Sequence, residues 1–159
     1  MIDAELYVKG LAERLAADGC QLADEHLGLV GYKTQVKALT RRHIFLVAAK
    51  AGTVDQNVLA DFAADAVALC AARQAQQGGG QSSLIVLPAL IAEVTTPDAV
   101  GLTLSPLQLN HGGFEVLAQP ALVDLSAGVS HRFREVGIFG YAYSSLIKQK
   151  LALYLPDPA

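Results

Sequence analysis

The sequence predicts a single α+β domain, and three observations carry that prediction. Stretches with helical and with strand-like hydrophobic periodicity follow one another in mixed order. The chain has 159 residues, the usual size of one domain, and neither a linker nor a second core is visible in it. It contains no internal repeat. We therefore expect one domain over residues 1–159, a mixed or antiparallel sheet flanked by helices in the order α-β-β-β-α-β-α-β-β-α.

The first part of the chain predicts a helix and then three strands. Apolar residues at helical spacing indicate a helix over residues 2–18, and Gly19 is a typical helix stop. Residues 33–39 alternate in the manner of a half-exposed strand. Residues 43–49 are apolar on both faces, which is typical of a central strand. Three strands are therefore expected within residues 20–49.

A long helix is the most regular feature of the sequence. Thr53 and Gln56 form a capping box that predicts its start, and the helix is expected to run to about Arg73. Its apolar stripe comprises Val54, Val58, Phe62, Ala66, Leu69 and Cys70, widened by Leu59, Ala63 and Val67. A polar, glycine-rich connection over residues 74–82 follows it.

The next segment predicts a strand and a short helix. Residues 84–94 are strongly apolar, and Pro88 inside them implies an edge position, a bulge or a break. Pro97 is well placed at the first position of a short helix that Thr96 begins. Residues 107–113 are expected to be irregular.

The end of the chain predicts a hairpin and a last helix. Residues 114–124 and 129–134 read as two strands closed around residues 126–128. A final helix is expected over about residues 139–155, with aromatic and aliphatic side chains on its buried face.

The composition is apolar and nearly neutral. Hydrophobic residues make up 52% of the chain and charged residues 17%, with a mean hydropathy of +0.35 and a net charge of −3. A dense core, extra apolar surface buried in a homo-oligomer, or both would account for this. The longest apolar run, residues 84–92, is too short to span a bilayer, and the acidic Asp3 and Glu5 do not suit a signal peptide. We expect a soluble, cytoplasmic protein without a membrane partner.

Motifs for catalysis, metals and cofactors are missing from the sequence. Gly78–Gly80 follow a helix and precede a strand, the reverse of a phosphate-binding loop. The four histidines do not pair at metal-binding spacing, and no G-x-S-x-G elbow occurs. Cys20 and Cys70 are expected to be reduced thiols in or near the core. No metal, cofactor or catalytic residue is therefore assigned, and the sequence favours a non-catalytic protein over an enzyme.

The best local signal is a basic stretch without acidic residues. Five of the twelve basic residues, namely Lys33, Lys37, Arg41, Arg42 and Lys50, lie between His26 and Val54, where no Asp or Glu occurs. This stretch would suit an anion, whether nucleic acid, phosphate or an acidic protein surface. The alternative is a solvated strand whose lysines discourage edge pairing, because the aromatic residues expected for single-strand binding are missing.

A small-molecule pocket is a further possibility. His43 opens the expected central strand beside two arginines, and Tyr141 lies in an aromatic run near the end of the chain. His43, His111 and Tyr141 would line such a pocket between the sheet and the last helix. For the aromatic run around Tyr141, a helix packed into the core is the commoner outcome, and a dimer face is a further alternative.

Residues 2–94 resemble the core of restriction-endonuclease-like nucleases in the order of their elements. In that family the third strand carries a Glu-x-Lys or Asp-x-Lys that binds metal, whereas this chain has Ala48-Ala49-Lys50 at the matching place. The preceding strand, residues 33–39, offers no acidic ligand either. The resemblance implies a degenerate nuclease scaffold without metal-dependent cleavage.

Three functional hypotheses follow from the sequence. The first is a non-catalytic binding or assembly protein that acts as a homo-oligomer, based on the high apolar fraction without any site motif. The second is an anion or nucleic-acid binder on a degenerate nuclease-like scaffold. The third is a small-molecule enzyme with a pocket near the last helix.

Overall fold

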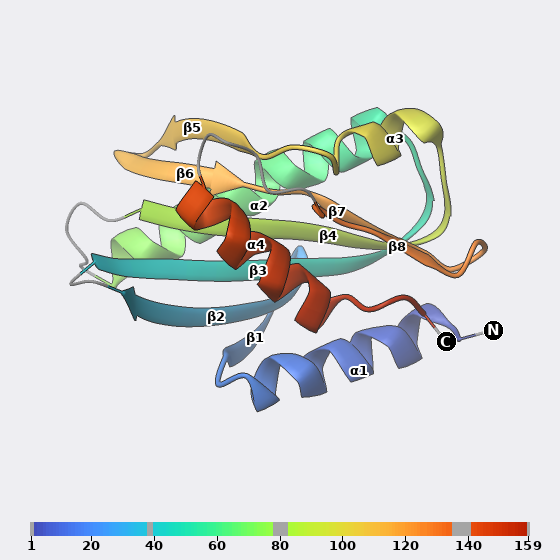
Figure 1. Ribbon diagram of the computed structural model, residues 1–159, viewed down its shortest axis with the longest axis horizontal. Helices are drawn as coiled ribbons and strands as arrows, with labels where there is room; N and C mark the ends of the chain where they lie inside the picture. Colours follow the sequence, from blue (N-terminus) through green and yellow to red (C-terminus); the bar gives the residue numbers. More distant parts are fainter. Residues whose placement is uncertain (1, 38–39, 78–82, 135–140, 159) are drawn as a thin grey trace.

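The computed structural model describes residues 2–37, 40–77, 83–134 and 141–158, with the side chains of residues 36, 37, 40, 41 and 141–143 outside the description. These residues form one mixed sheet with helices on both faces (Figure 1). The strand order is β1-β2-β3-β4-β6-β5, and the β7–β8 pair joins β4 beyond the end of β6. The α+β class predicted from the sequence is confirmed.

The first helix, α1, spans Ala4–Ala17. The Asp3 carboxylate caps it by accepting a hydrogen bond from the Leu6 main-chain N at 2.8 Å. Its buried face carries Tyr7, Leu11 and Leu15. The expected stop is confirmed, because Gly19 adopts a φ of 87° just beyond the helix.

The three expected strands form an antiparallel meander of β1 (Gln21–Glu25), β2 (Gly28–Lys37) and β3 (Thr40–Val54). Residues 43–48 of β3 are all buried, because helices cover both faces of the sheet there. Gly28 is required at the β1–β2 turn, since it has a φ of 147° and a Cβ would lie 2.1 Å from the Ala48 carbonyl oxygen.

The long helix is α2, Gln56–Gln76, and its predicted start and stripe need correction. Asp55, not Thr53, is the N-cap, because β3 continues through Val54 and the Asp55 carboxylate accepts from the Val58 N at 2.9 Å. The buried stripe is rotated accordingly, and Val58 is 41% exposed. The buried residues are Leu59, Ala63, Ala66, Val67, Cys70, Ala71 and Gln74.

The apolar strand is β4, Ser83–Thr95, which lies parallel to β3 in the middle of the sheet. An edge position for Pro88 is therefore wrong. Gln119 N donates to the Val86 carbonyl at 2.9 Å, so even-numbered residues of β4 direct their main-chain groups toward β6 and β7. Pro88 has no N–H group to donate to a neighbouring strand. It lies beside the break between β6 and β7, where neither strand pairs with it, so the missing donor costs no hydrogen bond of the sheet.

The segment after β4 contains more strands than expected. Helix α3, Pro97–Gly101, begins at the expected place with Thr96 as its N-cap. Residues 107–113 are not irregular, because β5 (Leu107–His111) pairs with β6 (Phe114–Ala118) as a hairpin. Gly112 and Gly113 close it with φ angles of 57° and 85°, the signature of a type I′ turn.

The predicted strand over residues 114–124 is two strands, because Gln119 and Pro120 separate β6 from β7 (Ala121–Asp124). The hairpin around residues 126–128 is confirmed, and it joins β7 to β8 (Val129–His131). The last helix is α4, Tyr141–Tyr154.

The sheet separates two apolar cores. Helices α1 and α4 pack on one face, against β3, β4 and β7 residues such as Leu46, Ile91 and Val123. Helix α2 packs on the other face, behind the sheet in Figure 1, against residues such as Phe45 and Val86. In the described part of the chain, no helix combines the length and the apolar character needed to cross a membrane.

Candidate functional site

The structure spreads the basic stretch along the sheet. Lys33 pairs in register with Ile44, while Lys50 lies near the other end of β3, about 20 Å away at the usual rise of a strand. Arg41 and Arg42 are consecutive residues of β3. Lys37 lies at the end of β2, and its side chain and that of Arg41 are outside the described part. Lys33 and Lys50 are therefore not parts of one patch.

Both lysines have acidic partners that the sequence analysis missed. Lys50 Nζ lies 3.5 Å from Glu5 Oε1, with both side chains exposed. Lys33 Nζ donates to the main-chain oxygen of Asp18 at 2.6 Å and lies 3.5 Å from Asp18 Oδ1. Asp18 lies just after α1 and 15 residues before Lys33 in the sequence. The two side chains meet because α1 packs against the sheet, which the sequence alone does not show.

Asp18 is the centre of a polar cluster at the end of α1. Lys150 Nζ donates to Asp18 Oδ2 at 2.7 Å, and the Tyr154 hydroxyl donates to the same oxygen. Cys20 Sγ lies 3.5 Å from the Tyr154 hydroxyl oxygen. We call Asp18, Cys20, Lys33, Lys150 and Tyr154 the Asp18 cluster. It joins α4 to the end of α1 and to β2.

The electrostatics of the Asp18 cluster suit anchoring rather than catalysis. Burial alone would raise the pKa of Asp18, but the hydrogen bonds from Lys150 and Tyr154 outweigh it and hold that pKa below its ordinary value. Burial and the bond to Asp18 raise the pKa of Tyr154, and burial raises the pKa of the Cys20 thiol. Tyr154 and Cys20 therefore stay protonated at neutral pH, which makes them poor nucleophiles.

The second cysteine lies in the core, as expected. Cys70 is fully buried on α2, and burial raises the pKa of its thiol to about 12. Both cysteines are free thiols. The expected placement of the two thiols in or near the core is confirmed.

His43 belongs to a hydrogen-bonded network on the α2 face. Its Nδ1 lies 2.7 Å from the Tyr32 hydroxyl, and its Nε2 lies 3.3 Å from Gln74 Nε2. The Tyr32 hydroxyl also lies 2.7 Å from Thr34 Oγ1. His43 is only 6% exposed, and the network runs from Gln74 of α2 through His43 of β3 to Tyr32 and the exposed Thr34 of β2.

Two of the three residues expected to line a pocket, His43 and His111, lie on the α2 side of the sheet, away from the last helix. His43 faces α2, on the side of the sheet away from α4. His111 ends β5 and lines a groove beside α2. Tyr141 is the first residue of α4, and its side chain lies outside the described part. Within the described residues, no three His, Cys, Asp or Glu side chains are grouped to hold a metal ion.

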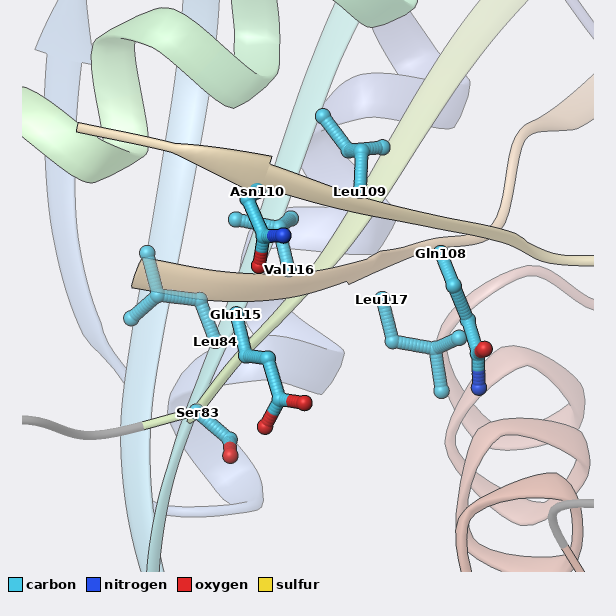
Figure 2. Close-up of a pocket in the computed structure, with 8 residues that line it drawn as sticks. All are labelled: Ser83, Leu84, Gln108, Leu109, Asn110, Glu115, Val116 and Leu117. Atoms are coloured by element: carbon cyan, nitrogen blue, oxygen red, sulfur yellow. The ribbon is translucent and has the colours of Figure 1, made fainter. Parts of the chain in front are cut away.

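A polar hollow of about 260 Å³ lies where β4, β5 and β6 meet (Figure 2). Register places Gln108 beside Leu117, and Asn110 and Ser83 beside Glu115, so these side chains share one face of the sheet. Figure 2 shows Gln108, Glu115 and Leu117 extending to the same side. That face is the one that carries α4. The residues that line the hollow offer hydrogen-bonding groups and a single carboxylate rather than a titratable pair.

The outer strands of the sheet differ in how they are protected against pairing with a strand of another chain. On β1, Asp24 and Glu25 supply charge, and Glu25 pairs with Arg73 at 2.6 Å. The outer side of β8 is covered, because the Ser130 N donates to the Asp157 carboxylate of the C-terminal segment at 2.8 Å. Among the described strands, β5, with the sequence LQLNH, pairs only with β6 and carries no Asp, Glu, Lys or Arg. We call Leu107–His111 the β5 edge.

The β5 edge is exposed and borders an apolar groove. Its residues are exposed except for the half-buried Leu109, and the side chain of Leu107 is 52% exposed. A groove of about 290 Å³ runs between β5 and α2, lined by residues such as Leu107, Leu109, Ala60 and Ala64. An open strand edge beside an apolar groove is the physical description of a surface for strand addition.

Comparison of the chain with protein-family models, with curated proteins and with solved structures found no match.

Proposed function

We propose that this protein is a non-catalytic assembly protein that acts as a homo-oligomer, and that two copies join through the β5 edge. The observation that carries the proposal is the contrast between this edge and the other two. Charge protects β1 and the C-terminal segment covers β8, whereas β5 is open and uncharged. Proteins usually blunt an outer strand to prevent association, so an unblunted one indicates an interface.

The main-chain pattern of β5 is complementary to itself. In a two-residue hairpin the flanking pair, His111 and Phe114, exchanges both main-chain hydrogen bonds. Alternation then turns the N–H and C=O groups of Gln108 and Asn110 away from β6. An antiparallel pair centred on Leu109 brings Gln108 of one copy opposite Asn110 of its partner. This arrangement satisfies all four outward groups on each copy and has the twofold symmetry of the commonest dimers.

The side chains support the same arrangement. Leu107, Leu109 and His111 share the face that borders the α2 groove. In the proposed pair Leu109 meets its own copy, and Leu107 meets His111 of the second copy. Burial of these leucines removes apolar surface from water, which favours association by about 25 cal/mol per Å². The low charged fraction of 17% is consistent with such a surface.

Sedimentation velocity over a range of protein concentrations tests the proposal. Wild-type protein is expected to shift from monomer to dimer as its concentration rises. Leu107→Lys, which adds one charge to each β5 edge, is expected to remain monomeric. Leu22→Lys is the matched control, because Leu22 lies on the β1 edge with a comparable exposure of 42%. A wild type that remains monomeric at every concentration, or a dimer unaffected by Leu107→Lys, contradicts the proposal.

The two other hypotheses have narrower support. The order α1-β1-β2-β3-α2-β4 agrees with the restriction-endonuclease-like resemblance, which would suit an anion or nucleic-acid binder. Two lysines of the basic stretch, Lys33 and Lys50, are however paired with Asp18 and Glu5. The polar hollow of Figure 2 would suit a small-molecule enzyme.

A further inference from the structure

A second groove has a chemistry that assembly through β5 does not use. It lies between α3 and β8 and has a volume of about 330 Å³. Its apolar wall is formed by Val100, Leu104 and Val129, and Leu104 is 67% exposed. Its polar wall is formed by Thr103, Ser130, His131, Arg132 and Arg134.

The polar wall carries more positive than negative charge. Arg132 and Arg134 are separated by one residue, and burial together with the nearby charge of Arg134 lowers the pKa of Arg132. Asp157 provides a partial counter-charge, with its Oδ1 3.9 Å from Arg132 Nη1 and its side chain 59% exposed. The residues that line the groove include these two arginines and no Asp or Glu, so Asp157 offsets only part of the positive charge.

The arginines are held in place but keep free donors. Arg132 Nη1 donates to the Leu155 carbonyl at 3.3 Å, and Arg134 Nη2 donates to the Ser130 carbonyl at 2.9 Å. Each guanidinium carries five N–H donors, and among the described residues these bonds use one donor of each.

We propose that this groove binds a small organic carboxylate, with the carboxylate on Arg132 and Arg134 and the apolar body against Val100, Leu104 and Val129. The planar fork of a guanidinium matches a carboxylate with two parallel hydrogen bonds. The apolar wall favours an anion with a hydrocarbon body over a bare inorganic ion. The position of Asp157 shows that a carboxylate group fits beside Arg132. The site is independent of the β5 edge.

Titration calorimetry with benzoate at constant ionic strength tests the site, with benzamide as the uncharged match and inorganic phosphate as the alternative anion. Benzoate is expected to bind with an affinity well above that of benzamide or phosphate. Amide chemical shifts of residues 129–132 are expected to move during the same titration. Absence of benzoate binding, or binding of phosphate as tight as that of benzoate, overturns the proposal.

Two arginine variants locate the binding to the groove. Arg134→Gln is expected to weaken benzoate affinity at least about tenfold, because a charged hydrogen bond is lost. Arg134→Lys keeps the charge without the fork and is expected to fall between it and the wild type. Lys148→Gln is the control, since it removes one exposed positive charge from α4 and should leave the affinity unchanged. Because Arg134 is exposed, the Arg134→Gln variant is expected to fold. Equal benzoate affinity of the wild type and this variant overturns the proposal.

Discussion

At the scale of single residues, Asp18 contributes most visibly to joining distant parts of the chain. It follows α1, yet it contacts Lys33 on β2 and both Lys150 and Tyr154 on α4. Lys150 is only 10% exposed, so loss of the carboxylate would leave a poorly hydrated cation without its partner. Asp18 is therefore expected to matter for stability rather than for chemistry.

Asp18→Asn is expected to lower the free energy of unfolding by about 2 kcal/mol near pH 7, the scale of hydrogen bonds to charged groups. The pKa of Asp18 is lowered in the folded state, so its contribution is present above the ordinary pKa of an aspartate. It is lost as the pH falls through the folded-state pKa. Urea unfolding across acidic to neutral pH should therefore show the wild type and the variant converging in acid. Asp65→Asn, at an exposed position of α2, is the control and should change little.

Sequence reasoning located elements better than it located side-chain partners. Cys70 and the first helix stop were predictable, because local periodicity and a glycine signal suffice for them. The partners of Lys33 and Lys50 were not, because Asp18 and Glu5 precede them in a different element. Likewise, the N-cap of α2 is Asp55 rather than Thr53, because β3 extends two residues past Gly52. That extension depends on pairing with β4, which is distant in the sequence.

At the scale of elements, the β5–β6 hairpin has a recognisable sequence signal, although residues 107–113 were expected to be irregular. Leu107 and Leu109 alternate with Gln108 and Asn110, and a glycine pair follows His111. That is the usual signal of a hairpin with a two-residue turn. The strand break at Gln119 was harder to predict, because it depends on β6 and β7 sharing β4 as a neighbour.

Gly113→Ala tests the importance of the type I′ turn. Gly113 has a φ of 85° with open space where a Cβ would lie, so the variant suffers backbone strain without a clash. We expect it to reduce stability by about 1 kcal/mol and to weaken dimerisation, because the hairpin presents the β5 edge. Gly52→Ala is the matched control, since Gly52 also faces open space but lacks a positive φ. Thermal unfolding of the two variants should therefore differ, and equal melting temperatures would argue against a strained turn.

At the scale of the whole molecule, the sheet has a covered centre and unequal edges. The two cores bury β3 and β4 between α1 with α4 on one side and α2 on the other. The apolar residues thus fill the two cores and also include exposed leucines beside β5. The composition indicates how many apolar side chains the chain has, but not which of them stay exposed at an edge of the sheet. Which strand lies at an edge depends on the order of strands in the sheet.

Amide hydrogen exchange at the β5 edge tests the central proposal most directly. Gln108 and Asn110 direct their N–H groups away from β6, so these amides are unpaired in a monomer and hydrogen-bonded in the proposed dimer. Their protection is expected to rise with protein concentration, while amides of β1 stay constant. Exchange of Gln108 and Asn110 that is fast and identical at low and high concentration would contradict assembly through β5.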